Sequence, residues 1–154
     1  MASTTFSGPV TSTNGFIGNV TGTVTGTVAT SDTTATKAVT AAESGTTFFL
    51  NSATEFVSTL PAPAAGLTYS FVVVAAPASA SYTVVTATSA NIIVGKQFCS
   101  EDSAGDTGTA DDTITFVDGQ AVAGDRVDLI SDGTKWYAYA FSAVAAGITF
   151  TQAT

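Results

Sequence analysis

Small apolar and polar residues alternate along the first part of the chain, most regularly in the stretch NVTGTVTGTVAT at residues 19–30. Side chains of an extended strand alternate between two faces, so Val20, Val24 and Val28 would share one face with the intervening glycines. The threonines would occupy the other face. Glycines and successive β-branched residues oppose a helix here. Because an isolated strand or hairpin is marginal in water, the pattern predicts a segment that needs a partner.

The remainder of the chain consists of short apolar runs separated by turn residues, and no segment carries a 3.6-residue apolar stripe over three turns. This spacing is typical of β-sandwiches. We expect strands at residues 46–50, 55–60, 67–75, 81–87, 91–95, 113–117, 124–131, 134–141 and 147–151. The predicted fold is all-β, with residues 1–36 as an extended N-terminal arm and residues 37–154 as a β-sandwich domain.

The pair Asp132-Gly133 lies between two strand-like runs and favours a two-residue type I′ hairpin turn. Such a turn would pair Ser131 with Thr134 and Leu129 with Trp136. Directly opposed residues share a face, which predicts a core face made of Val127, Leu129, Trp136, Ala138 and Ala140. The outward face would carry Arg126, Asp128, Ile130, Lys135, Tyr137 and Tyr139. Trp136 is therefore expected to pack in the core and not to serve as a platform for a ligand.

Arg126, Tyr137 and Tyr139 form a candidate subunit interface on that outward face. Tyrosine beside arginine is typical of interface cores. Two other interpretations stay open: the tyrosines shield the sheet or lie under a loop of their own chain, or they stack on a sugar. Complete enclosure of both phenol rings within one chain would exclude the contact with another subunit.

The charge balance excludes several classes of partner. The 154 residues contain 12 acidic and 4 basic side chains, giving a formal net charge of −8. Nucleic-acid binding depends on Lys and Arg that neutralise phosphates, and anionic membranes attract the same residues, so we expect neither partner. No apolar run approaches the ~18 residues that span a bilayer. The polar start MASTTFSGPV predicts a cytosolic product without a secretion signal.

Chemistry-bearing residues are sparse. The chain has no histidine, which removes the usual catalytic triads and most zinc sites, and it has no phosphate-binding glycine motif. We expect no enzyme activity, no cofactor and no metal. The acidic stretch at residues 101–112 could offer oxygen ligands to a hard cation, but its spacing does not match an EF-hand, so a solvated loop is the simpler expectation. Cys99, the single cysteine, is expected to be a buried or half-buried small residue.

Several stretches resemble the decoration, or cement, proteins of tailed-phage capsids. FSGPVTSTNGF followed by the VTG repeat is similar to their N-terminal arms. AAESGTTFFLNSATEF, TLPAPAAGLTYSFVVVAAP and GDRVDLISDGTKWYAYAF resemble their β-sandwich bodies. The resemblance implies a jelly-roll-like sandwich that binds the outer surface of an assembled virion shell. It also implies the major capsid protein as partner and a homotrimer at local three-fold positions.

In this interpretation the arm pairs with the edge of a neighbouring sheet, which supplies the missing main-chain hydrogen bonds. A stretch of 36 residues reaches on the order of 100 Å when extended. The expected arm interface comprises Phe6, Pro9, Phe16, Ile17, Val20, Val24 and Val28. Phe6, Phe16 and Ile17 would be the anchors, because they hold most of the apolar surface outside the repeat.

Two alternatives belong to other functional classes. The first is a phage fibre or tail-tip module that binds a host surface glycan, which should show exposed aromatic residues beside carboxylates in a groove. The second is a bacterial adhesin or matrix domain, against which the polar N-terminus counts. A decoration protein should instead place its tyrosines and its arm at contacts with neighbouring subunits.

Overall fold

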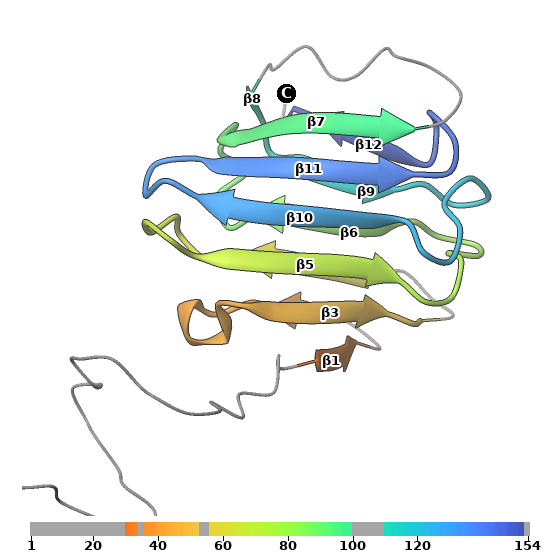
Figure 1. Ribbon diagram of the computed structural model, residues 1–154, viewed down its shortest axis with the longest axis horizontal. Coiled ribbons are helices and arrows are strands. Elements are labelled where there is room, and N and C mark those ends of the chain that lie inside the picture. The colour runs from red at the N-terminus through yellow and green to blue at the C-terminus, as the bar shows by residue number, and fades with distance from the viewer. Residues whose placement is uncertain (1–29, 34–35, 53–55, 100–109, 153–154) are drawn as a thin grey trace, which may run out of the picture.

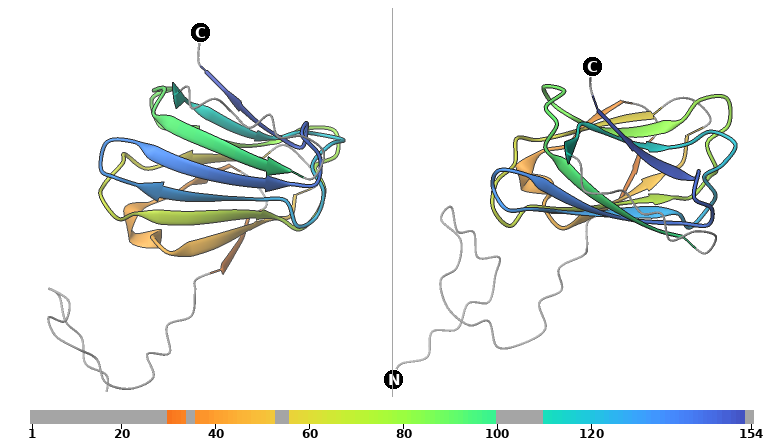
Figure 2. Two further views of the ribbon diagram at one scale, coloured as in Figure 1. Left: turned by 45° about the horizontal axis from the view of Figure 1, so that its top comes forward. Right: turned by 90° about the horizontal axis from the view of Figure 1, so that it is seen from above.

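The computed structural model describes residues 30–33, 36–52, 56–99 and 110–152, which form two β-sheets packed face to face (Figures 1 and 2). The larger sheet contains β1 (Thr30–Thr33), β3 (Thr46–Leu50), β5 (Thr68–Val73), β7 (Ile93–Cys99), β8 (Ala110–Asp111), β10 (Arg126–Ser131) and β11 (Trp136–Ser142). The smaller sheet contains β2 (Lys37–Ala38), β4 (Phe56–Leu60), β6 (Tyr82–Thr86), β9 (Thr113–Phe116) and β12 (Ile148–Thr151). The all-β sandwich prediction is confirmed.

The chain crosses between the two sheets at every step from β1 to β7. Up to β6, each return lays a strand beside the one two elements earlier and in the same direction, so β1, β3 and β5 pair in parallel, as do β2, β4 and β6. Strand β7 instead pairs in parallel with β11. The β10–β11 hairpin lies between β5 and β7, in the order β1-β3-β5-β10-β11-β7-β8, while the smaller sheet runs β12-β9-β6-β4-β2. Because jelly rolls are antiparallel, these parallel pairs do not confirm the jelly-roll connectivity.

The core lies between the sheets, where alternation along most strands buries every second side chain. Strands β3, β4 and β6 each alternate buried and half-buried residues without interruption. Phe48 and Phe71 stack with ring centroids 5.1 Å apart, and Tyr69 lies 5.6 Å from Trp136. Trp136 is fully buried, as predicted. Rings of this size dominate the burial of apolar surface that stabilises a sandwich of short strands.

The predicted faces of the β10–β11 hairpin are correct, but its predicted register is wrong by two residues. Ser131 pairs with Trp136 and Leu129 with Ala138, so the loop contains four residues, 132–135. Gly133 has φ +101°, whereas Asp132 does not adopt the positive φ that a type I′ turn requires. A slip of two residues preserves which side chains face the core, because the side-chain period of a strand is two.

The Asp132 carboxylate explains the longer loop. One of its oxygens accepts hydrogen bonds from the backbone N–H of Thr134 at 2.7 Å and of Lys135 at 2.8 Å, and from the Thr134 hydroxyl at 2.8 Å. The side chain thus replaces the main-chain partners that a two-residue turn would have provided, as aspartate commonly does in turns.

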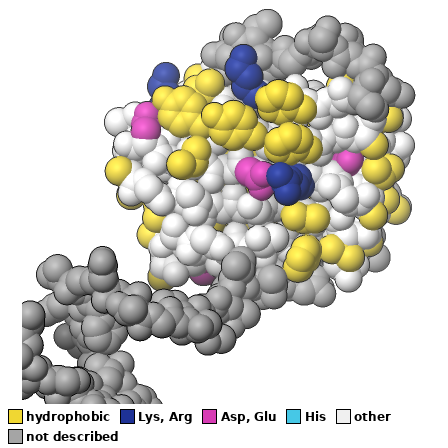
Figure 3. All heavy atoms as spheres, viewed as in Figure 1, with side chains coloured by type: hydrophobic (Ala, Val, Ile, Leu, Met, Phe, Trp, Pro, Cys, Tyr) yellow, Lys and Arg dark blue, Asp and Glu magenta, His cyan; other side chains and the backbone are white. Residues whose placement is uncertain are grey.

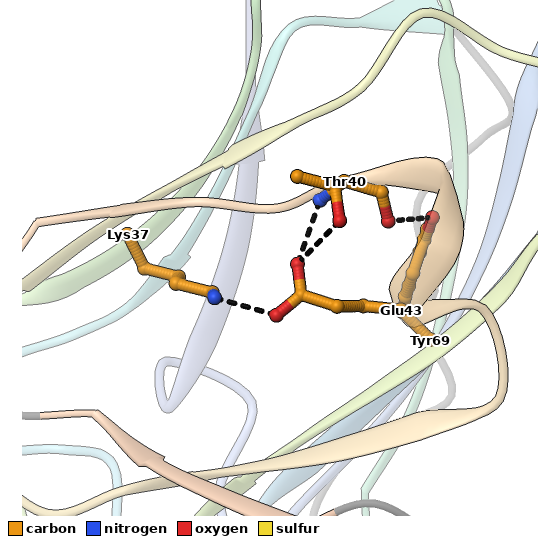
Figure 4. A network of polar contacts seen from close by, with 4 residues as sticks. All are labelled: Lys37, Thr40, Glu43 and Tyr69. Carbon is orange, nitrogen blue, oxygen red and sulfur yellow. Dashed lines mark hydrogen bonds and ion pairs between the residues drawn. The ribbon is translucent and has the colours of Figure 1, made fainter.

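A polar network fixes the start of the sandwich domain at the 3-10 helix η1 (Ala41–Glu43). Glu43 pairs with the Lys37 ammonium and accepts hydrogen bonds from the backbone N–H and the hydroxyl of Thr40, each at 2.9 Å (Figure 4). The Tyr69 hydroxyl donates to the Thr40 carbonyl at 2.9 Å. This network ties η1 to β5 of the larger sheet.

The stretch expected to be the arm, residues 1–36, contributes β1 to the edge of the larger sheet. Thr30 to Thr33 pair in parallel with Thr47 to Leu50 of β3. Residues 1–29 lie outside the described structure. Within the described residues no helix has the length and apolar character needed to cross a membrane.

Candidate interaction face

Large hydrophobic side chains gather on the outer face of the larger sheet, over β7, β10 and β11 (Figure 3). Phe98, Ile130, Tyr139 and Phe141 expose 52%, 46%, 44% and 39% of their surface. We call this surface the aromatic face and define it by the outward-facing residues of these three strands. They are Val94, Lys96, Phe98, Arg126, Asp128, Ile130, Tyr137, Tyr139 and Phe141.

Contacts between neighbouring strands order one end of the aromatic face. The rings of Phe98 and Phe141 stack with centroids 5.3 Å apart, and the Arg126 guanidinium lies 4.9 Å from the Phe141 centroid. Arg126 also pairs with Asp128 at 3.1 Å. Asp128 in turn accepts a hydrogen bond from the Ser70 hydroxyl at 2.8 Å. A cation over an aromatic ring and an aromatic pair each contribute about 1 kcal/mol, so these contacts favour the observed arrangement of the exposed side chains.

Tyr137 is held at the other end of the aromatic face by the hairpin loop. Its hydroxyl donates to the second oxygen of Asp132 at 3.0 Å. This hydrogen bond to the carboxylate raises the pKa of Tyr137. The pKa of Asp132 is strongly lowered, chiefly by the backbone N–H groups of Lys135 and Thr134. The phenol is therefore oriented on the surface while its ring remains half-buried.

The outer face of the smaller sheet has a different character. Thr83, Thr115 and Thr149 lie in one row across β6, β9 and β12, and each is half-buried. Short hydroxylated side chains of this kind suit contact with water. Among the described residues, no large hydrophobic side chain is strongly exposed on that sheet face. The asymmetry between the two sheets marks the aromatic face as the surface where a partner would bury apolar area.

A shallow pocket of about 420 Å³ lies at the edge of the aromatic face beside Phe98 and Phe141. Asp125 lines it, but this carboxylate is buried and already accepts hydrogen bonds from the backbone N–H groups of Val122 at 3.0 Å and Ala143 at 2.9 Å. Its oxygens thus hold two loops in place. They are poorly available to the hydroxyls of a ligand.

The three residues expected at a subunit interface all lie on the aromatic face. Tyr139 is 44% exposed and Tyr137 is half-buried, so the two phenol rings are not enclosed within the chain. The condition that would have excluded a subunit contact is therefore not met.

Sequence reasoning missed Phe98, Phe141 and Lys96 as members of this face. Phe141 continues the every-second-residue series of Tyr137 and Tyr139, and that signal could have identified it. Phe98 and Lys96 lie beyond the strand that the sequence predicts at residues 91–95. The strand instead continues to Cys99.

The other expectations fall partly outside the described residues. This applies to the arm interface residues Phe6, Pro9, Phe16, Ile17, Val20, Val24 and Val28, and to residues 101–109 of the acidic stretch. Asp111 and Asp112 are described and are buried, in contrast to the solvated loop expected there. Within the described part of the chain, no group of three or more His, Cys, Asp or Glu side chains is placed to hold a metal ion. Cys99 is half-buried, as expected.

In comparisons with known proteins, no family model, no curated protein and no solved structure matches this chain.

Proposed function

We propose that this chain is a non-enzymatic structural protein of a tailed-phage virion that binds the outer surface of the capsid. It would stabilise the shell by bridging neighbouring subunits through its arm and its sandwich domain, with the major capsid protein and other copies of itself, as a homotrimer, for partners. The observation that carries the proposal is the aromatic face, an ordered and exposed apolar surface on the same sheet whose edge receives the arm at β1.

The arm supports the proposal through its composition and its point of attachment. Residues 1–29 contain no charged side chain, and they precede a strand that already pairs at the edge of the larger sheet. A fully extended segment of this length spans roughly 100 Å. Paired with a neighbouring sheet edge, it would gain main-chain hydrogen bonds while Phe6 and Phe16 fill apolar pockets.

The aromatic face supports a contact between proteins better than a catalytic role. Exposed aromatic residues and arginine are enriched in protein interfaces. At its ordered end the exposed side chains of Arg126 and Asp128 pair at 3.1 Å beside the aromatic rings, a combination that suits contact with another protein.

Glycan binding by a fibre or tail-tip module is the second candidate, and the pocket beside Phe98 and Phe141 favours it. Aromatic rings can stack on sugars. Two observations weigh against it: the Asp125 carboxylate of the pocket is occupied by backbone donors, and the aromatic residues spread over a sheet face beyond the pocket.

Co-sedimentation with phage heads that lack this protein tests the proposal. We expect saturable binding of the full chain and loss of binding when residues 1–29 are deleted, a truncation that retains β1. A thermal melt of the truncated protein is the control for folding. Absence of saturable binding to heads by the full chain would overturn the capsid role and direct the next test to the host cell surface.

Substitution of both Phe6 and Phe16 by alanine tests the anchors. We expect weaker attachment with an unchanged melting temperature, because these residues precede the described sandwich. A double substitution of Thr4 and Thr13 by alanine is the matched control, because neither residue belongs to the expected arm interface. Unchanged occupancy of the Phe6/Phe16 variant would remove these residues as anchors.

A further inference from the structure

The aromatic face is built from three rows that cross β10, β11 and β7 in register. Strand pairing aligns the rows, and directly opposed residues share a face. The first row is Arg126–Phe141–Phe98, the second is Asp128–Tyr139–Lys96, and the third is Ile130–Tyr137–Val94. An aromatic residue from β11 occupies the centre of every row.

The two flanks of this face are chemically complementary. On the β10 side lie a guanidinium, a carboxylate and an aliphatic side chain; on the β7 side, in the same rows, lie an aromatic ring, an ammonium and an aliphatic side chain. Within one chain the flanking strands are separated by β11, which places their backbones about 10 Å apart. The two flanks therefore complement each other better across a contact between two surfaces than within one chain.

From this register we infer that two copies of the chain pack their aromatic faces together about a two-fold axis that runs along β11 and passes over Tyr139. A half-turn about such an axis places β10 of one copy over β7 of the other and keeps each row opposite the same row. Arg126 of one copy then faces Phe98 of the other, Asp128 faces Lys96, and Ile130 faces Val94. Each of these contacts occurs twice, as in any isologous interface.

Charge favours a second copy at this face. The chain carries a net charge of −8, so two copies repel one another over most approaches. Lys96 and Arg126, two of its four basic residues, lie on the aromatic face. In the dimer, each Lys96 lies opposite Asp128 of the other copy and each Arg126 lies opposite Phe98. The contact therefore contains two opposite-charge pairs and two cation–aromatic pairs.

The size of the face sets the strength of the contact. The three strands of the aromatic face present a patch of roughly 15 Å by 20 Å. Two copies would bury less than the roughly 1,000 Å² of a stable specific interface, so the association is weak, depends on concentration and is favoured on a crowded shell. The inference deepens the proposed function, in that it rests on the aromatic face being a contact between subunits. The three-fold assembly requires a different, heterologous surface.

Site-directed cross-linking tests the axis. In a Cys99→Ser background, Tyr139→Cys would place one thiol of each copy on either side of the axis. Packed sheets lie about 10 Å apart, which is too far for a disulfide, so a bis-maleimide with a spacer of about 10 Å is the probe. We expect cross-linking at least tenfold faster than for Thr115→Cys on the smaller sheet. Equal rates for the two sites would overturn the two-fold contact.

Charge reversal tests the pairing of the flanks. In a dimer of Lys96→Asp, each new carboxylate would face Asp128 of the other copy. In a dimer of Asp128→Lys, each new ammonium would face Lys96 of the other copy. A mixture of the two variants restores both opposite-charge pairs in a heterodimer. By sedimentation equilibrium we expect each variant to self-associate at least tenfold more weakly than the wild-type chain and the mixture to regain the association. A mixture no tighter than its components would overturn the register.

The outcomes separate this inference from the proposed function. Arm-dependent binding to heads together with no preferential cross-linking at position 139 would leave the capsid role standing and overturn the two-fold contact. Preferential cross-linking without binding to heads would support the two-fold contact and overturn the capsid role. A trimer in solution that fails to cross-link at position 139 also overturns the two-fold contact.

Discussion

The rings of Phe98 and Phe141 stack on the outer face of the larger sheet, with their planes inclined by 18° and their centroids 5.3 Å apart. They come from β7 and β11, which are far apart in the sequence but adjacent and parallel in the sheet. This stack borders the shallow pocket, and the Arg126 guanidinium lies over the Phe141 ring. Surface aromatic residues held in one arrangement lose little entropy when a partner covers them, which suits an interface.

Removal of this stack should have little effect on folding. We expect Phe98→Ala to lower the free energy of unfolding by about 1 kcal/mol, the usual worth of an aromatic pair. Phe71→Ala, which empties a fully buried site, should cost about 3–5 kcal/mol. Urea denaturation of the two variants provides the comparison. A loss for Phe98→Ala as large as that for Phe71→Ala would show that the stack belongs to the core.

Gly95, within β7, allows the two sheets to approach each other closely. A Cβ added at this position would overlap the ring of Phe150 on β12. We therefore expect Gly95→Ala to destabilise the fold by roughly 1–3 kcal/mol, as overpacking does. Thermal or urea unfolding measures the loss.

A second substitution tests the cause of that loss. Phe150→Ala combined with Gly95→Ala removes the clashing ring, so the double variant should lose less than the sum of the two single losses. Additive losses would indicate that Gly95 is needed for another reason, such as the conformation of its own backbone.

Glu43 should contribute stability that disappears in acid. Its hydrogen bond with Lys37 is the leading reason why its pKa is lowered. A carboxyl whose pKa is lower in the folded state stabilises the fold above its unfolded pKa of about 4.3, and this stabilisation is lost as the pH falls through the folded value. Both side chains are 29% exposed, so screening limits the pair to about 0.5–1 kcal/mol.

Melting curves of the wild-type chain and Glu43→Gln at a series of pH values from 3 to 7 measure this effect. The difference in melting temperature should be largest near neutrality and should shrink toward pH 3. Lys37→Met is the matched control, because it removes the partner and leaves the carboxyl in place. A difference independent of pH would assign the effect of Glu43→Gln to something other than its charge.

Asp132 should set the titration of Tyr137. Asp132→Ala removes the carboxylate that accepts a hydrogen bond from the Tyr137 hydroxyl. The pKa of Tyr137 should therefore fall toward its ordinary value near 10. NMR titration of the tyrosine ring carbons measures this shift, with Tyr137→Phe identifying the resonance. The variant should also fold less stably, because Thr134 and Lys135 lose their acceptor. An unchanged Tyr137 titration would contradict the contact.

The acid limb of the stability curve gives a further check on Asp132. Because the pKa of Asp132 is lowered in the folded chain, its contribution is complete above the unfolded value near 3.9 and is lost only at lower pH. The stability difference between the wild-type chain and Asp132→Ala should therefore persist through the neutral range. A difference that vanished above pH 5 would contradict this assignment.

The sequence by itself determined most of the strands and which of their side chains face inward, but it did not predict β1, β2 or β8. All nine predicted strands are present, and β3 has the bounds that were predicted for it. Leu129 and Trp136 face the core, and Tyr139 faces outward, as alternation required. These properties follow from a period of two, which is local and survives errors of register.

Only the tertiary structure decided how the strands meet. The four-residue loop depends on where the Asp132 side chain finds donors, and β7 continues past Gly95 because residues 96–99 pair with β11. The aromatic face arises because β7 pairs in parallel with β11, which brings Phe98 beside Phe141 and Lys96 beside Tyr139. Pairing of strands that are distant in the sequence is a property of the whole packed sandwich, and no local pattern of residues specifies it.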